Sequence, residues 1–210
     1  VPTHGRDEVA AVATSFNAAA DRIEKLVSAH RTLLANASHE LRSPLARLRM
    51  AAELNAYEPS EARRQDMLTS LGELDELVEE ILLASRLDHS GVSPQKRVTM
   101  PVDLLALAAE EAARHGLEAG GATALVEGDA KLLTRLVRNL IVNALRHGAP
   151  PVEISVDKAG GKARLIVRDH GPGIPAGEGE RVFEPFYRPA GRSETSGGWG
   201  LGLALVRQIA

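Results

Sequence analysis

A histidine inside a long amphipathic stretch is the first residue of this sequence that could carry chemistry. At about 100° per residue, His39 falls nearly opposite the apolar seam of its helix, so we expect it to face solvent. Ser43 lies one turn later on the same face, and Glu40 lies to one side, within reach of the imidazole. Neutral imidazole can act as a nucleophile, a base or a ligand, but position alone does not separate these roles from an ordinary surface histidine.

A pair of amides on a later helix is the second candidate. Asn139 and Asn143 are four residues apart and therefore share a helix face, with Arg135, Arg146 and His147 close by. Amide oxygens can complete the shell of a Mg²⁺ ion whose other ligands are phosphates and water. Solvated or capping amides are the simpler interpretation of either residue taken alone.

Two glycine-rich segments form the third candidate. One runs from Asp169 through Gly171 to Gly173 after an alternating strand pattern, and the other runs from Gly197 to Leu203 before a helical pattern. Glycines before a helix let backbone N–H groups approach an anion, although turns explain most glycine clusters. Neither the P-loop spacing nor the dinucleotide-binding G-x-G-x-x-G spacing after a strand occurs. Together with the amide pair, the two segments favour nucleotide binding.

The composition excludes several classes of protein. The chain has 210 residues, no cysteine and a formal net charge of −3, so disulfide frameworks, thiolate metal sites and cysteine nucleophiles are excluded. The charge gives no basic field of the kind that nucleic-acid binders carry, and we expect no nucleic-acid partner. The remaining histidines lack metal-ligand spacing, and no apolar run approaches the roughly 20 residues of a membrane span.

The first 90 residues are predicted to form two helices. Apolar positions alternate three and four apart from Asp7 to Ala56, including Phe16, Ile23, Leu33 and Leu48, which is the pattern of a coiled-coil seam. After a turn at residues 57–60, a second helix is expected from Glu61 to about Asp88. A seam this long needs a partner, and a second copy supplies it most simply, so we expect a parallel homodimer whose hairpins form a four-helix bundle.

The second half is predicted to be an α+β layer fold. The composition shifts near residues 89–94, after which helices are expected over about residues 104–115 and 130–147, the latter capped by Asp129. Apolar residues alternate at 152–156 and 163–167 around a turn at 159–161, which predicts an antiparallel hairpin with one covered face. Residues 100–103 are expected to lead into the first helix, and residues 116–128 are poor in β-formers.

Five motifs in this order resemble the cytoplasmic part of a bacterial sensor histidine kinase of two-component signalling. SHELRSPLARLRM at residues 38–50 resembles the H box, RLVRNLIVNALRHG at 135–148 the N box, and DHGPGIP at 169–175 the first glycine box. VFEPFYRP at 182–189 resembles the F box, and GGWGLGLALV at 197–206 the second glycine box. The resemblance implies a four-helix bundle followed by a two-layer ATP-binding domain of the histidine kinase and Hsp90 type.

The resemblance also implies functional roles for named residues. ATP would phosphorylate His39, Glu40 would accept or orient the imidazole proton, and the phosphoryl group would pass to an aspartate of a response regulator. Asn143 would bind Mg²⁺, Asn139 would support the phosphate end, and Asp169 would accept a hydrogen bond from the adenine amino group. Further nucleotide contacts are implied at Arg146, His147, Gly171, Gly173, Gly198, Gly200, Gly202 and Leu203, with residues 188–197 as a lid.

The implied organisation has three parts. Residues 1–27 resemble the end of a HAMP linker, residues 28–92 the dimerisation and histidine phosphotransfer domain, and residues 96–210 an ATP-binding domain that stops short of the family's last strands. In this family a HAMP linker follows a transmembrane helix, so an upstream anchor would hold this region at the cytoplasmic side of the inner membrane. Trp199 stands where the family often has a small hydroxyl residue, so it could shield the nucleotide or pack on the lid.

Two other functions compete with phosphotransfer. The gyrase, Hsp90 and MutL ATPases share the fold, but they carry a water-activating Glu at the position of Asn139, which offers no general base. A non-catalytic dimeric scaffold that relays a signal is the other alternative. Ser43 occupies a position where the family often has Thr or Asn linked to dephosphorylation of the regulator. Its unrestricted hydroxyl predicts weak phosphatase activity, unless Ser43 is simply a solvated residue before Pro44.

Overall fold

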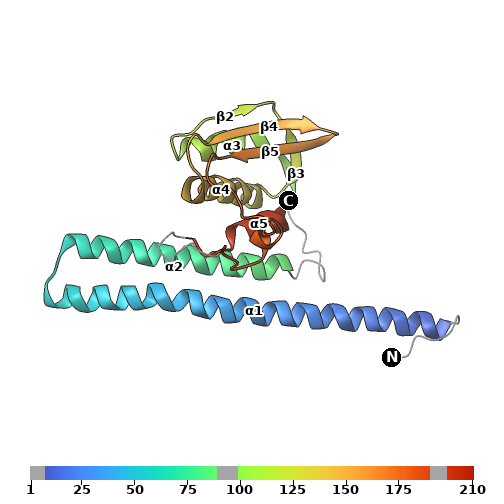
Figure 1. The fold of residues 1–210 in the computed structure, drawn as a ribbon, viewed down its shortest axis with the longest axis horizontal. Helices are drawn as coiled ribbons and strands as arrows, with labels where there is room; N and C mark the ends of the chain where they lie inside the picture. The colour runs from blue at the N-terminus through green and yellow to red at the C-terminus, as the bar shows by residue number, and fades with distance from the viewer. Residues whose placement is uncertain (1–7, 89–98, 190–197) are drawn as a thin grey trace. The chain divides into compact units, whose positions relative to one another are not determined.

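A computed structural model gives the fold for residues 8–88, 99–189 and 198–210 (Figure 1). The chain divides into two compact units, one ending at Asp75 and the other covering Glu76–Ala210. Each unit is described by itself. The sequence boundary expected near residues 89–94 and the first seven residues of the HAMP-like segment lie outside the described residues.

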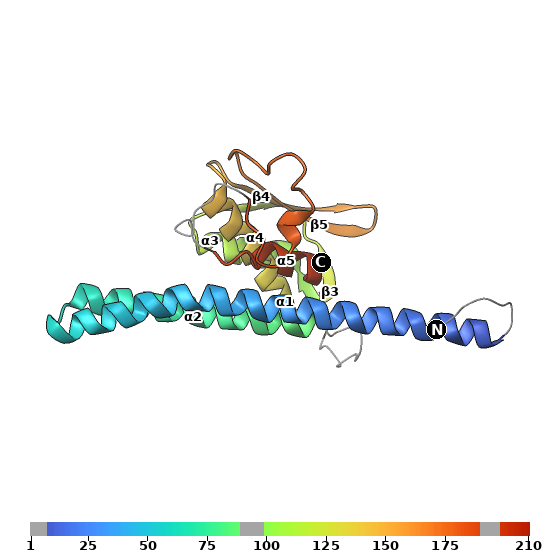
Figure 2. The same ribbon diagram turned by 60° about the horizontal axis from the view of Figure 1, so that its bottom comes forward.

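The first unit contains helix α1 and the first half of helix α2, and the second half of α2 belongs to the second unit; both helices form as the apolar repeat predicts. Helix α1 covers Glu8–Tyr57 and helix α2 covers Glu61–Asp88, which places both within a residue of the predicted bounds. The turn is fixed by the side chain of Asn55, whose Oδ1 accepts a hydrogen bond from the Ser60 N–H at 3.0 Å. Figure 2 shows the two helices still side by side near this turn, where Arg47 Nη2 lies 3.1 Å from Glu73 Oε2.

The predicted seam of α1 divides into covered and uncovered positions. Leu33 and Ala37 are buried, whereas Phe16 and Ile23 have about three fifths of their surface exposed, at 61 % and 62 %. Pro44 lies inside α1 and is fully buried. Among the described residues, no helix is long and apolar enough to cross a membrane. Helix α1 therefore keeps an apolar strip that the described residues leave uncovered.

The second unit holds two small sheets and three helices. Strand β1 (Met100–Asp103) pairs antiparallel with β3 (Leu125–Gly128), while β2 (Ala119–Gly121) runs parallel to β4 (Glu153–Ala159), which pairs antiparallel with β5 (Lys162–Arg168). The helices are α3 (Leu104–Ala113), α4 (Ala130–His147) and α5 (Gly202–Ile209), and a short 3-10 turn, η2, covers Arg181–Phe183. Helices α3 and α4 cover one face of the three-stranded sheet (Figure 1).

The core of this unit forms between that sheet face and the two helices. Alternation in β4 points Ile154 and Val156 inward, where they meet Ala108 of α3 and Ile141 of α4. The predicted hairpin and its covered face are therefore confirmed. The carboxylate of Glu111 on α3 is almost fully buried between two arginines, with Arg138 Nε at 2.9 Å from Oε2 and Arg114 Nε at 3.2 Å from Oε1.

Three strands were not predicted. Residues 100–103 lead directly into helix α3, as expected, but they do so as strand β1, and residues 119–121 and 125–128 are also strands. The sequence pattern of β1 is weakened by Pro101, and that of β2 by Gly120 and Gly121, because proline and glycine are uncommon inside strands. Gly121 has a φ of 121°, and a Cβ there would lie 2.0 Å from the Val156 carbonyl oxygen. Pairing with β4, rather than local propensity, therefore makes β2.

Candidate nucleotide site

Helix α4 supplies the largest set of candidate residues. Asp129 caps its start, because Oδ1 accepts hydrogen bonds from the N–H groups of Lys131 and Leu132 at 2.8 and 3.4 Å. The predicted cap and helix start are confirmed. The helix is strongly amphipathic: Val137 and Ile141 face the core, while Asn139 and Asn143 lie on the half-buried side.

The end of α4 and the first glycine box are in close contact. A Cβ on Gly148, the residue that follows α4, would lie 2.3 Å from Cγ of Asp169, and a Cβ on Gly171 would lie 2.6 Å from Cα of Gly148. The N–H of His170 donates to the Ala149 carbonyl at 2.9 Å, and the Gly171 N–H donates to Asp169 Oδ1 at 2.8 Å. The carboxylate of Asp169 is therefore held in one orientation at the end of the helix.

The second glycine box lies beside the same helix. Asn139 Nδ2 donates a hydrogen bond to the carbonyl of Gly202, the first residue of α5, at 3.1 Å. A Cβ on Gly198 would lie 3.4 Å from Arg146 Nη1 and 4.0 Å from His147 Nε2. Two basic side chains from the end of α4 therefore reach a glycine with a positive φ of 85°.

The F box joins this group through contacts that the sequence did not reveal. The Phe186 N–H donates to the Gly200 carbonyl at 2.9 Å, and Arg188 Nη2 donates to the Gly198 carbonyl at 2.7 Å. Phe186 is a non-glycine residue with a positive φ of 64°, and a Cβ on Gly200 would lie 2.9 Å from its backbone. Phe186 and Arg188 were part of a recognised motif but were not assigned as site residues; the only signal was their place in that motif.

A tyrosine next to these residues has a shifted pKa. Burial, and then a hydrogen bond with Glu178, raises the pKa of the Tyr187 phenol, while the nearby Arg181 acts in the opposite direction. The Arg181 guanidinium lies 4.3 Å above the centre of the Tyr187 ring. The net rise in the pKa keeps the Tyr187 phenol neutral at ordinary pH, so this residue contributes packing and a hydrogen bond rather than acting as a base.

These contacts bring four of the five motifs together. The N box, both glycine boxes and the F box meet around the C-terminal half of α4, through Asn139, Gly148, Asp169, Gly198 and Gly202. Arg146 and His147 are at the same place. Gly173, which has a φ of 76°, and Leu203 belong to the same segments, and their contacts with a nucleotide stay predictions. Most of the predicted lid, residues 190–197, lies outside the described residues.

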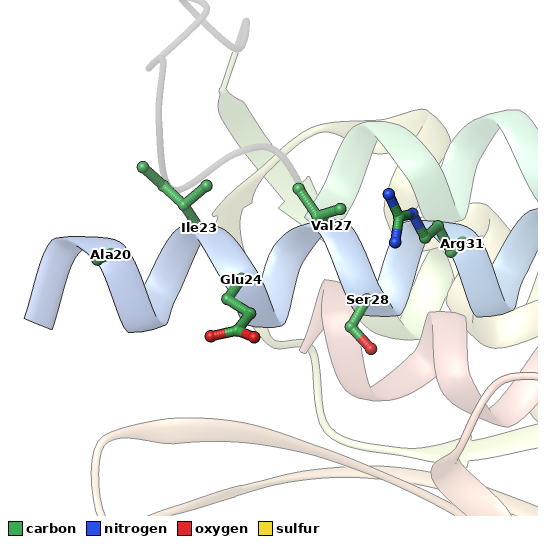
Figure 3. A pocket seen from close by; sticks show the side chains of 6 residues that line it. All are labelled: Ala20, Ile23, Glu24, Val27, Ser28 and Arg31. Atoms are coloured by element: carbon green, nitrogen blue, oxygen red, sulfur yellow. The ribbon is translucent and has the colours of Figure 1, made fainter.

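The other unit carries the remaining candidates on α1. His39 and Ser43 are exposed, as the helical geometry predicts, and Glu40 is partly exposed beside them. A histidine on this face is open to a reactant approaching from solvent. Nearer the start of α1, a surface hollow is lined by Ala20, Ile23, Glu24, Val27, Ser28 and Arg31 (Figure 3). Ile23 and Val27 project from the same side of the helix in that view and continue the uncovered apolar strip.

The donor set around α4 fits a phosphate ligand better than a metal alone. Within the described ranges, there is no group of three or more His, Asp or Glu side chains that could hold a metal ion. Arg146, His147 and Arg188 offer cationic or N–H donors next to glycine backbone, and Asn143 offers a neutral amide on the same helix. Such a set suits a polyphosphate whose cation is coordinated mainly by phosphate oxygens and by one amide.

Comparison with protein families assigns the two halves of the chain separately. Residues 29–90 match the His Kinase A (phospho-acceptor) domain, and residues 128–210 match the histidine kinase-, DNA gyrase B- and HSP90-like ATPase family. The first match contains His39, and the second contains all the residues that meet around α4.

Similar proteins include sensor proteins of bacteria. The chain is 36 % identical to sensor protein RstB of Escherichia coli K12 over 209 residues, which are 93 % of this chain and 47 % of that protein. It is 34 % identical to sensor protein CutS of Streptomyces coelicolor, over 97 % of this chain and 52 % of CutS. The chain thus spans about half the length of these relatives. The solved structure of histidine kinase AdeS of Acinetobacter baumannii matches with a TM-score of 0.65 at 24 % identity, over 81 % of this chain and 85 % of that one, which shows the fold.

Proposed function

Because the chain belongs to the two-component sensor histidine kinases, and corresponds to their cytoplasmic region, we propose that it transfers the γ-phosphoryl group of ATP to His39. The phosphoryl group then passes to an aspartate of a response regulator. The single observation that carries this proposal is the meeting of the N box, F box and both glycine boxes around α4, on a fold whose other unit exposes a histidine.

The ATP end of the proposal rests on the residues that meet there. Asp169, fixed by the Gly171 N–H, accepts a hydrogen bond from the adenine amino group. Arg146, His147 and Arg188 attract the phosphates next to Gly198, whose backbone lies close to these side chains. Asn143 would hold Mg²⁺ through its amide oxygen, and the bound ion would neutralise phosphate charge. Asn139 acts at the phosphate end through its bond to Gly202.

The chemistry at His39 needs only alignment and a proton acceptor. A neutral ring nitrogen attacks the γ-phosphorus, a new N–P bond forms, and the bond to the leaving oxygen of ADP breaks. The proton on the other ring nitrogen is stabilised or accepted by Glu40, the adjacent carboxylate. In the second step an aspartate oxygen of the regulator attacks the same phosphorus and His39 leaves as neutral imidazole after proton return.

A domain organisation follows from the same family. We infer a HAMP-like end over residues 1–27, a dimerisation and histidine phosphotransfer domain over residues 28–92, and an ATP-binding domain over residues 96–210. In the full-length protein, an anchor upstream of this chain holds the region at the cytoplasmic face of the inner membrane. The relatives described as sensor proteins, such as RstB, support this inference.

The homodimer is inferred from surface that the chain leaves uncovered. Ile23, Leu45 and Leu54 on α1 and Leu71 on α2 are each about half exposed or more, at 62 %, 52 %, 52 % and 47 %. Monomeric soluble proteins rarely expose an apolar strip of this length, because contact between apolar side chains and water is unfavourable. A partner that covers the strip removes this contact. A second copy of the hairpin offers the same strip and completes a four-helix bundle.

The test uses purified chain with γ-labelled ATP and Mg²⁺. We expect label that is stable in base and labile in acid, as a phosphohistidine is, and that disappears in His39→Ala. His30→Ala, a change of the same type on the same helix, should keep the label. A dimer of normal stability and normal nucleotide binding by His39→Ala would show that only the acceptor was lost.

Two results would contradict the proposal. Label that persists in His39→Ala would place the nucleophile elsewhere. Release of inorganic phosphate at a high rate without any protein label would favour the hydrolytic alternative, in which water is the acceptor.

A further inference from the structure

The acidic end of α2 belongs to the same compact unit as the ATP-binding fold, because that unit begins at Glu76. Glu80 Oε1 of α2 lies 3.1 Å from Arg135 Nη2 of α4, and Glu79 Oε2 lies 3.9 Å from Arg135 Nη1. The side chains of Arg135 and Glu80 are only 17 % and 15 % exposed. This pair is therefore much less screened by solvent and salt than an exposed ion pair such as Arg207 with Glu180.

Arg135, the α4 residue in this ion pair, lies on the helix face that carries the candidate nucleotide-binding residues. Arg135 precedes Asn139 by four residues and Asn143 by eight, so the three side chains follow one another along one side of α4. Arg146 also acts on Glu80 electrostatically, as does Glu76 with the opposite sign. The carboxylates at the end of α2 therefore lie in the field of the same arginines that would attract the phosphates of ATP.

From this we infer that Glu80, with Glu79 beside it, is an intramolecular competitor of the ATP phosphates: it occupies Arg135 in a docked state that binds ATP weakly and must release for tight binding. This inference rests on the proposed function, since it takes the α4 face as the phosphate side. The competition is electrostatic, because a polyphosphate and the carboxylates of Glu79 and Glu80 repel one another when they approach the same arginine.

Two further observations indicate that the docked state is easily released. Burial raises the pKa of the Glu80 carboxyl despite the opposing effect of Arg135, so holding the charged carboxylate there is unfavourable relative to water. Among the described residues, the buried Nε of Arg135 has no hydrogen-bond partner. A guanidinium that a carboxylate satisfies only in part can gain from a ligand that offers more oxygen atoms.

Linkage sets the sign of every expected effect. If docking and ATP compete, weakening the docked state must raise ATP affinity, and ATP must lower the docked population by the same factor. A pair that only stabilises the fold would predict neither result.

The first experiment measures equilibrium binding of ATP, in the presence of Mg²⁺, to the full chain in the His39→Ala background, so that no phosphoryl transfer intervenes. Glu80→Gln keeps the size of the side chain and removes its charge. We expect its Kd for ATP to fall about 5-fold or more, which is within the usual range of coupling between sites. Glu73→Gln is the matched control, because Glu73 is an acid of the same helix paired with Arg47 in the other unit.

The second experiment detects the docked state directly. The chain has no cysteine, so Glu76→Cys on α2 with Arg138→Cys on α4 introduces the only two thiols and leaves Glu80 and Arg135 in place; Glu76 acts electrostatically on Arg138, which places the two positions near each other. A short bifunctional thiol reagent should join them within one chain, and the yield should fall when ATP is added. Glu61→Cys with Arg138→Cys, which uses the far end of α2, should give less product.

Each outcome decides between the alternatives. Unchanged or weaker ATP binding by Glu80→Gln, or a cross-linking yield that ATP does not alter, would overturn the competition while leaving the kinase proposal intact. Absence of ATP binding by both Glu80→Gln and its parent would instead contradict the proposed function. Because the cross-link reports on the contact without depending on the folding of Glu80→Gln, a poorly folded variant would not leave the inference undecided.

Discussion

The ATP-binding unit and the α1 hairpin place their apolar side chains in opposite ways. In the ATP-binding unit, Val137, Ile141 and Val156 are fully buried between the sheet and its helices. In α1, Ile23 and Met50 have 62 % and 65 % of their surface exposed. One unit buries its apolar side chains by itself, and the other leaves many of them exposed among the described residues. If the proposed dimer covers those side chains, the stability of this chain has two different sources, one within the chain and one between chains.

The chemistry is divided in the same manner. The residues proposed to hold ATP are crowded together by backbone contacts around α4, whereas His39 stands on an exposed helix face. A binding site needs many groups in fixed positions, but an acceptor that must meet two reactants in turn needs access. Substitutions should therefore separate the two regions cleanly.

The largest expected effect is on activity in the ATP-binding unit. Asn143→Ala removes the amide proposed as the Mg²⁺ ligand, and we expect phosphohistidine formation to fall about 100-fold or more, since even indirect metal partners contribute 10- to 100-fold. Sedimentation should show the same oligomeric state for Asn143→Ala as for the unchanged chain. The rate of label incorporation at saturating Mg²⁺ and ATP is the measurement, and an undiminished rate would exclude Asn143 as a ligand.

The next effect is on the stability of the same unit. Ile141 is completely buried in the core, so Ile141→Ala should lower the free energy of unfolding by about 2–5 kcal/mol through lost burial and a cavity. Denaturant unfolding should show the loss in the transition of this unit. If the helical hairpin lost stability to the same extent, the two units would not be independent.

A pair of equally exposed residues sharpens the comparison directly. Ile23 on α1 and Leu125 on β3 have nearly the same exposure, 62 % and 65 %. If a second copy covers only the α1 strip, Ile23→Ser should raise the dimer dissociation constant about 100-fold or more, because about 1.5–3 kcal/mol of burial is lost in each of the two copies. Leu125→Ser should leave the constant unchanged. Sedimentation across a dilution series measures both, and equal responses would show that exposure alone does not identify the dimer face.

The smallest expected effect lies on the exposed face of α1. Ser43 keeps a hydroxyl that can hold a water molecule, but it lacks the methyl group that restricts the rotamer of Thr. We expect Ser43→Thr to increase dephosphorylation of a phosphorylated cognate regulator a few-fold, and Ser43→Ala to reduce it. The rate of phosphate release from the regulator is the measurement. Equal rates for all three proteins would assign Ser43 to simple solvation.

Local signals allowed most helices to be predicted and the shortest strands to be missed. Asp129 predicts the start of α4 because its side chain caps the helix, and Gly160 and Gly161 predict the turn of the β4–β5 hairpin. Strand β2 is only Ala119–Gly121, and its existence depends on β4, which lies more than 30 residues later. No pattern within three residues can carry that information, so the missed strands reflect long-range pairing.

The candidate site likewise has residues that local motifs predict and contacts that depend on distant segments. The motifs name Asn139, Asp169 and the glycines, because backbone and amide chemistry limit which residue types can stand there. The contact between Gly148 and Gly171, the left-handed Phe186 and the Arg135–Glu80 pair depend on segments far apart in the sequence. Glu80 and Arg135 are 55 residues apart and each looks like an ordinary surface charge until the helices are placed.

The hydrogen bond from Asn139 to Gly202 bears on how such a fold could change its reaction during evolution. A carboxylate has no N–H to donate, so Asn139→Glu would lose this bond and set a negative oxygen near the Gly202 carbonyl. The lost bond alone costs about 0.5–1.5 kcal/mol, before repulsion is counted. A descendant that acquired a water-activating glutamate here would therefore pass through a less stable intermediate, unless the first turn of α5 had already changed.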